Sequence, residues 1–205
     1  MQNDAIPAKP AKTSRPLIDE IRQRWSPRAF DPDREIDPET LTTLLEAARW
    51  APSSFNDQPW RYLVFDRSDP QARAKAEACL FDGNSWARNA AVLIISAGAR
   101  TSSRTGRPNR FVLHDTGMAT MNLILQAISH GLVSHQMGGY DRERARAEFD
   151  IPEEFELASM IAIGYAGDPA TLPPEVGERE AAPRQRSQIS DFVFAGTWGR
   201  PLEDG

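Results

Sequence analysis

Hydrophobic residues recur at helical spacing in several stretches of the chain and form short apolar runs in others. One helical stretch begins at Asp37 and Pro38, a pair typical of a helix start, and is ended by Pro52. The stretch 111–130 is apolar around much of its circumference, which predicts a central buried helix. The apolar run 90–97 is short, which predicts a buried strand.

Strands and helices do not alternate regularly along the chain, and this order predicts an α+β fold. The periodicities predict helices over 17–21, 38–51, 70–80, 111–130 and 141–149, and strands over 60–65, 90–97, 133–140 (a strand or loop) and 158–165.

The two ends of the chain differ in composition from the middle. Residues 1–15 mix Pro, Ala and Lys without periodicity, so we expect a flexible tail there. We expect one domain over 16–195 and a C-terminal extension over 196–205. Prolines at 169, 173 and 174 indicate an extended linker before a last segment over 184–198.

Composition narrows the classes of function. The 205 residues are 40% hydrophobic and 26% charged, as in a folded globular protein. The net charge of −5 argues against nucleic-acid binding. A single cysteine, Cys79, excludes an internal disulfide and a multi-cysteine metal site, and the three histidines lack metal-ligand spacing. No stretch is long enough to span a membrane and no secretory signal is visible, so a cytoplasmic protein is expected.

A cationic turn near the start is the first candidate for chemistry. Arg24 and Arg28 flank Ser26, and in a tight turn these three side chains can converge on one anion. The alternative is an ordinary solvated charged face. Arg184 and Arg186 form a second basic pair near the end of the chain.

The loop from Pro52 to Trp60 is more specific. Prolines at both ends restrict its backbone, and Ser53, Ser54 and Asn56 offer donors and acceptors that can contact the edge of a heteroaromatic ring. The alternative is a polar turn with ordinary capping chemistry.

In their order and spacing, these segments resemble the FMN-dependent nitroreductase family. The resemblance covers residues 17–195 and rests on Arg24-x-Ser26-x-Arg28-x-Phe30, Ala51-Pro52-Ser53-Ser54-x-Asn56-x-Gln58-Pro59-Trp60, a central helix with Asp115, Gly117, Ala119, Asn122 and Leu123, the turn Gly138-Gly139-Tyr140-Asp141, and Arg184-x-Arg186.

The resemblance implies a nitroreductase-like α+β fold with a central mixed or antiparallel sheet flanked by helices. It also implies an intertwined homodimer with an FMN site at each interface. The implied activity is a ping-pong transfer of hydride from NAD(P)H through the flavin to nitroaromatic, quinone or similar flat acceptors.

The resemblance also assigns roles to particular residues, with no catalytic side chain and no metal among them. The phosphate and ribityl chain would be held by Arg24, Ser26, Arg28, Arg184 and Arg186. The partner subunit would contribute Pro52, Ser53, Ser54 and Asn56. The ring would lie against Asn84, Met137, Gly138 and Gly139. Several family members carry an acidic residue where this chain has Gly138, so the acceptor is left open.

Three other functions stay open from the sequence. A flavin-binding protein with little turnover would share the same cofactor site. Relatives on this fold that cleave flavin, remove halogens or desaturate peptides would share the site as well. A phosphate-binding domain without flavin would explain the cationic turn but not the loop after Pro52. The choice between NADH and NADPH is also left open.

Overall fold

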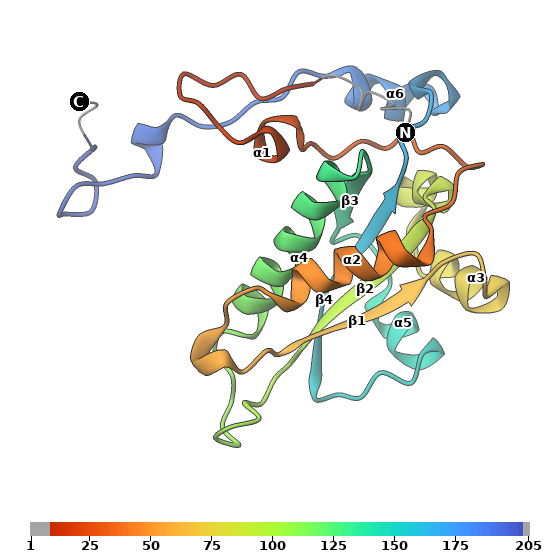
Figure 1. Ribbon diagram of the computed structural model, residues 1–205, viewed down its shortest axis with the longest axis horizontal. Coiled ribbons are helices and arrows are strands. Elements are labelled where there is room, and N and C mark those ends of the chain that lie inside the picture. Colours follow the sequence, from red (N-terminus) through yellow and green to blue (C-terminus); the bar gives the residue numbers. More distant parts are fainter. Residues whose placement is uncertain (1–8, 203–205) are drawn as a thin grey trace.

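A four-stranded antiparallel sheet forms the centre of the molecule. The computed structural model describes residues 9–202, and within them β1 (Trp60–Phe65), β2 (Val92–Ala99), β3 (Val133–Met137) and β4 (Phe155–Gly164) pair in the order β1-β2-β4-β3 (Figure 1). Every neighbouring pair is antiparallel. The predicted α+β class is confirmed, and of the two predicted sheet types the antiparallel one is found.

Both faces of the sheet are covered by helices. One face packs against α2 (Pro38–Arg49) and α4 (Val112–Ser129), and the other against α3 (Pro70–Ala78), α5 (Arg142–Glu148) and the 3₁₀ segment η2 (Asp82–Asn89). Successive residues of a strand point to opposite faces, so Ile94 of β2 packs with α4 while Ile95 packs on the other side. A central strand buried on both faces explains the unbroken apolar run in the sequence.

Most predicted helices begin where the capping residues place them. The Asp37 side chain accepts a hydrogen bond from the backbone N–H of Thr40 at 2.8 Å, and Pro38 is the first residue of α2. Asp69 and Asp141 cap α3 and α5 in the same way. The predicted helix over 111–130 is confirmed as α4, whose Leu123 is completely buried.

Three predictions need correction, and one element was missed. The segment predicted as an extended linker contains helix α6 (Pro174–Ala181), because Pro174 occupies the first helical position, where a missing N–H costs nothing. The 3₁₀ segment η2 was not predicted. Strand β4 begins at Phe155, ahead of the predicted residue 158, and β2 is displaced toward the C-terminus by two residues from the predicted 90–97.

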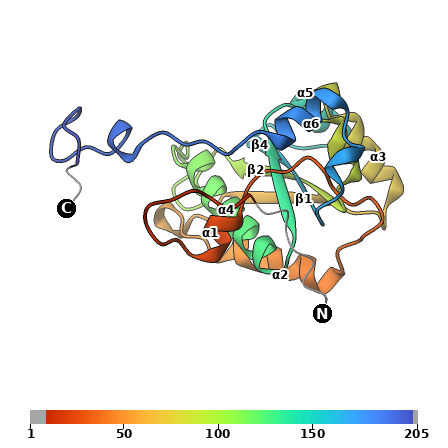
Figure 2. The same cartoon turned by 90° about the horizontal axis from the view of Figure 1, so that it is seen from above.

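Beyond Arg184 and Arg186 the chain leaves the body of the molecule as an arm, residues 187–202 (Figure 2). The arm carries the short 3₁₀ segment η4 (Ile189–Asp191), and the side chains of Ile189, Phe192 and Trp198 on it are exposed. At the other end, the backbone N–H of Ala11 donates to the carbonyl of Arg22, which lies in α1 (Asp19–Gln23). Residues 1–8 of the predicted tail lie outside the described residues. No helix within 9–202 has the length and apolar character needed to cross a bilayer.

Candidate functional site

Three arginines from the two ends of the chain gather beside β3. Burial lowers the pKa of the Arg24 guanidinium, and the positive charges of Arg184 and Arg186 lower it further. Burial, followed by the charge of Arg186, lowers the pKa of Arg184. Arg24 Nη1 donates to the Ser26 hydroxyl at 3.1 Å. Within residues 9–202 none of the three guanidinium groups is paired with a carboxylate, so this arginine cluster (Arg24, Arg184 and Arg186) is an uncompensated positive site.

A buried carboxylate on α6 fastens this cluster together. Glu180 is 2% exposed, and its two oxygens each accept from the backbone N–H of Arg28 at 3.0 Å. Its Oε1 also accepts from the N–H of Ala29 at 3.3 Å, and its Oε2 lies 3.7 Å from Arg28 Nη1. These contacts hold the end of α6 against the cationic turn, which brings the segment 184–186 close to Arg24. Sequence reasoning missed Glu180, because nothing in the local pattern of a charged helix marks one carboxylate as buried.

The cationic turn is also held by the end of β4. The N–H of Asp31 donates to the carbonyl of Tyr165, and the N–H of Gly167 donates to the carbonyl of Ala29. A Cβ atom on Gly167 would lie 2.4 Å from the carbonyl carbon of Phe30. Only glycine therefore allows the turn to approach the strand this closely.

His135 links the arginine cluster to the rest of the candidate site. Its Nδ1 donates to the carbonyl of Pro27 at 3.0 Å, and its ring packs on Trp86 with the ring centroids 4.6 Å apart. Burial is the main cause that lowers the pKa of His135 to about 4; the charges of Arg28 and Arg24 add to it, and the bond to Pro27 opposes it. The imidazole is therefore neutral at pH 7, as expected for a packed, hydrogen-bonded histidine.

The predicted ring-contact residues come together at the end of β3. Asn84 Nδ2 donates to the carbonyl of Gly139 at 2.7 Å, and Met137, two residues before Gly139 in the sequence, is buried. A Cβ atom on Gly139 would lie 3.0 Å from Asn84 Nδ2, whereas a Cβ atom on Gly138 would meet no atom within 4 Å. The space beside Gly138 is therefore open.

The loop after Pro52 lies elsewhere in the same chain. The N–H of Ser54 donates to the buried Asp115 carboxylate in the first turn of α4 at 3.0 Å, whereas His135 and Pro27 lie beside the strand that follows the last turn. An α-helix of this length measures about 27 Å. Figure 1 shows the loop and the cationic turn at opposite ends of α4. One chain therefore does not bring Pro52, Ser53, Ser54 and Asn56 to the arginine cluster.

This loop has a strained backbone. Phe55, Asn56 and Gln58 have φ angles of 54°, 57° and 47°, in the left-handed region that a bulky residue such as Phe seldom adopts. The N–H of Gln58 donates to Ser53 Oγ at 3.0 Å, and the bond from Ser54 to Asp115 holds the other side. Strain of this kind persists only where the surroundings enforce it, and it is often found where a loop meets a ligand.

Comparison with known proteins identifies the family. The sequence profile of the Nitroreductase family matches residues 21–165. The chain belongs to this family. A solved structure described as an oxidoreductase containing FMN superposes with a TM-score of 0.86 at 34% identity, and covers 94% of this chain and 98% of its own.

Two curated proteins are similar in sequence to this chain. A 15.4 kDa protein of Mycolicibacterium smegmatis, whose name gives no function, is 37% identical over 58% of this chain and 80% of its own length. YdgI of Bacillus subtilis (strain 168), whose name describes a candidate NAD(P)H nitroreductase, is 29% identical over 72% of this chain and 87% of its own. As a nitroreductase-family member the protein is an FMN-dependent oxidoreductase, which confirms the predicted enzyme class and cofactor.

The His135→Asn variant should lose less stability in acid than the wild type. The folded-state pKa of about 4 lies below the ordinary value of 6.5, so the unfolded chain binds the extra proton between these values. Stability from this group is complete above pH 6.5 and falls as the pH drops toward 4, by about 3 kcal/mol. Asn keeps a donor for Pro27 but cannot titrate. Urea unfolding at pH 7 and pH 4.5 checks this. His130→Asn, at an exposed position, should keep the wild-type loss, and an unchanged loss in His135→Asn would contradict the assignment.

Proposed function

We propose that the protein is an NAD(P)H-dependent reductase of flat, electron-poor acceptors, with the FMN phosphate on the arginine cluster. The observation that carries the proposal is the gathering of Arg24, Arg184 and Arg186 without a carboxylate partner. Three like charges that repel one another are stabilised by a dianionic phosphate, and a phosphate is desolvated at low cost only where several charged donors surround it. The Ser26 hydroxyl adds a neutral donor, and Arg28 lies at the rim with its side chain 24% exposed.

The ring of the flavin is proposed to lie along the end of β3. Asn84 would contact the pyrimidine edge, with its orientation fixed by the bond to Gly139. Met137 closes the buried side, and the backbone N–H groups of Gly138 and Gly139 would face the central ring. When bound, FMN supplies the two-electron chemistry between NAD(P)H and the acceptor.

The open space beside Gly138 bears on the acceptor. Gly138 itself offers no charged or hydrogen-bonding side chain to the proposed substrate side of the ring. An acceptor would therefore be selected by flat shape and reduction potential, which suits nitroaromatics and quinones. Donor and acceptor would use this space in turn, in a ping-pong order.

A second copy of the chain is proposed to complete each site with Pro52, Ser53, Ser54 and Asn56. In one chain this loop lies a helix length from the arginine cluster, and its backbone is strained. A partner subunit whose loop contacted the flavin at this cluster would explain the strained backbone, because such strain is often found where a loop meets a ligand.

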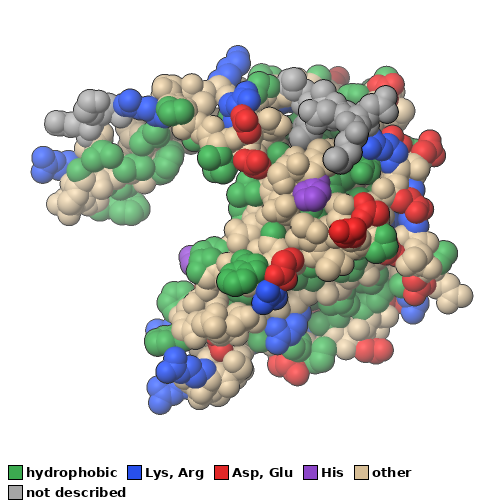
Figure 3. Space-filling view, viewed as in Figure 1, with side chains coloured by type: hydrophobic (Ala, Val, Ile, Leu, Met, Phe, Trp, Pro, Cys, Tyr) green, Lys and Arg blue, Asp and Glu red, His purple; other side chains and the backbone are tan. Residues whose placement is uncertain are grey.

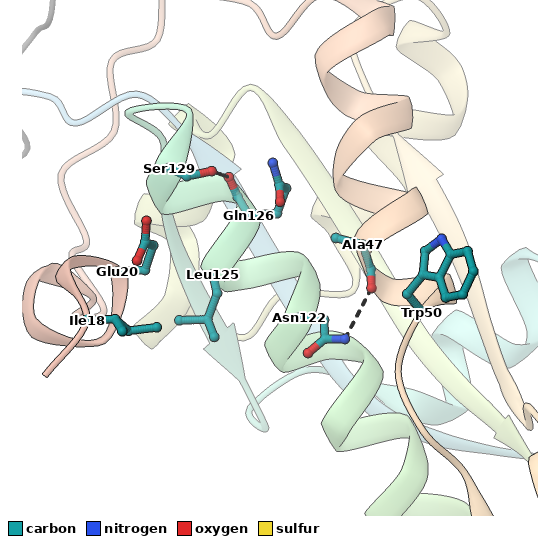
Figure 4. A pocket seen from close by; sticks show the side chains of 8 residues that line it. All are labelled: Ile18, Glu20, Ala47, Trp50, Asn122, Leu125, Gln126 and Ser129. Atoms are coloured by element: carbon teal, nitrogen blue, oxygen red, sulfur yellow. Dashed lines mark hydrogen bonds between the residues drawn. The ribbon is translucent and has the colours of Figure 1, made fainter.

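Exposed apolar surface supports the homodimer. A groove of about 380 Å³ lies between α1, α2 and α4, and Ile18, Trp50 and Leu125 line it (Figure 4). Hydrophobic side chains also gather on the concave face between the arm and the body (Figure 3). The accessible surface is 12526 Å², against roughly 9,600 Å² for a compact monomer of this mass. Part of this excess belongs to the C-terminal arm, whose Phe192 and Trp198 side chains are exposed in one chain.

The first test is the visible spectrum of the purified protein before and after anaerobic NADH or NADPH. We expect a yellow flavin spectrum that bleaches with a nicotinamide nucleotide and recovers when a quinone or nitroaromatic compound is added. Flavin that stays oxidised with both nucleotides would favour a flavin-binding protein with little turnover.

The phosphate assignment is tested by Arg186→Ala. This variant should bind FMN more weakly by about 2 kcal/mol, because it loses a charge-assisted contact to the phosphate. Riboflavin, which has the same ring and no phosphate, should bind the variant and the wild type equally. Titration of flavin fluorescence measures both affinities. Arg179→Ala removes an exposed arginine from α6 and serves as the matched control. Equal weakening of FMN and riboflavin binding would show that the phosphate does not bind at this cluster.

Shared sites predict a particular result for mixed dimers. A dimer with Ser54→Ala and Asn56→Gly in one chain only should retain one of its two FMN sites. Glycine is chosen at 56 because it tolerates the positive φ that alanine would strain. The flavin content of mixed dimers purified with two different tags gives the answer. Loss of both sites, or of neither, would contradict a loop shared between chains.

A further inference from the structure

An arginine-rich hairpin connects β2 to α4. Residues 100–110 contain four arginines and no acidic residue, in a chain whose net charge is −5. The hairpin is ordered by backbone bonds, among them Ser102 N–H to the carbonyl of Arg107 and Asn109 N–H to the carbonyl of Arg100. In Figure 3 Lys and Arg side chains gather at the tip of the molecule that carries this hairpin in Figure 1.

Three of these arginines have no acidic partner. Arg100 at the base pairs with Glu156 at 2.8 Å. Arg104, Arg107 and Arg110 are exposed and are not ion-paired with any carboxylate in the described part of the chain. Positive charges held in one short hairpin repel one another and create a local positive potential despite the acidic body. We call these three residues the arginine patch.

The hairpin is fastened to the strained loop after Pro52. The Asp57 carboxylate accepts from the N–H and the hydroxyl of Ser103, at 3.0 and 2.8 Å, and from Asn109 Nδ2 at 3.4 Å. The Arg104 guanidinium lies 5.3 Å from the centroid of the Phe55 ring. The Asp57 carboxylate is therefore occupied by hydrogen bonds to the hairpin. These bonds fix the position of the arginine patch relative to the loop.

We propose that the arginine patch is a phosphate-binding rim that recognises the 2′-phosphate of NADPH and makes NADPH the preferred electron donor. The inference rests on the proposed function, in which the loop that carries the hairpin reaches the flavin of the second copy. A nicotinamide ring stacked on that flavin leaves the adenosine end of the nucleotide outside the ring pocket, where the hairpin extends about 10 Å past its base.

The chemistry of the patch favours this ligand. Guanidinium groups bind phosphate oxygens through paired N–H donors. NADPH differs from NADH by one phosphate on the adenosine ribose. A rim of three cations would bind this phosphate and so distinguish between the two donors. The pyrophosphate, which both nucleotides share, is the other phosphate that could reach these residues.

The decisive experiment compares the wild type with the variant R104A/R107A/R110A, both loaded with FMN. The rate of anaerobic flavin bleaching against nucleotide concentration gives kcat/KM for NADPH and NADH. We expect the wild type to prefer NADPH, and the triple variant to lose about tenfold or more in kcat/KM for NADPH with NADH unchanged. Arg179→Ala should keep the wild-type ratio, and the variant with three lysines should recover part of it.

A second readout does not depend on turnover. Adenosine 2′,5′-bisphosphate should bind the FMN-loaded wild type in calorimetry more tightly than adenosine 5′-monophosphate, and added salt should weaken it. The triple variant should lose this difference.

Three other outcomes would each overturn the inference. Equal losses for NADPH and NADH would assign the patch to the shared pyrophosphate. An unchanged donor ratio with weaker reduction of nitrobenzoate relative to nitrobenzene would assign it to an anionic acceptor. An unchanged donor ratio alone, in a variant that still holds FMN, would leave the patch without a binding role. If neither nucleotide bleaches the wild type, the proposed function fails while calorimetry still decides whether the patch binds the 2′-phosphate.

Discussion

The buried carboxylate of Glu180 is the contact on which the candidate site depends. It joins two segments separated by 152 residues, because it accepts backbone N–H groups of the cationic turn from its place on α6. A buried carboxylate is costly unless it is hydrogen-bonded and paired, and here it has both kinds of partner. The N–H groups of the turn and the Arg28 guanidinium compensate the negative charge of Glu180. Arg24, Arg184 and Arg186 are therefore held near one another without being neutralised, and positive charge remains available for an anion.

The length of α4 is the second constraint. The helix is buried between α2 and the sheet, so the loop held by Asp115 at its first turn cannot approach the turn held by His135 after its last. The two halves of the proposed site thus lie at opposite ends of α4 in each chain. Strain in the loop, the open groove beside α1 and the apolar arm are features that a single chain leaves uncompensated. All three are accounted for together if the chain functions as a pair.

Local patterns in the sequence were sufficient for most of the fold and for part of the site. Helix α2 could be predicted because Asp37 and Pro38 act within the first turn, and β2 because a strand buried on both faces is apolar throughout. Helix α6 could not, since consecutive prolines are equally typical of an extended linker. The start of β4 was hidden because Glu156, which pairs with Arg100, makes that end of the strand look polar.

The residues that hold the site in place were beyond reach for a different reason. The bond from Asn84 to Gly139, the burial of Glu180 and the bond from His135 to Pro27 all depend on partners at least 55 residues away in the chain. The types of residue that contact a ligand are visible in a motif, because the ligand's chemistry restricts them. The residues that position those ligand contacts are restricted only by the fold, and many residue types could do the same work.

The net charge of the protein does not describe the charge of its individual surface regions. The chain is acidic overall, yet positive side chains gather at the arginine cluster and at the hairpin 100–110. Such local fields attract anionic ligands even when the rest of the surface repels them. In the proposed dimer one positive region would lie at each end of the flat ring site, with the open space beside Gly138 between them. Charge would then act on the ends of the bound molecules, and shape and reduction potential on the part where electrons are transferred. This division would let one pocket accept a charged nucleotide and, after it, a neutral acceptor.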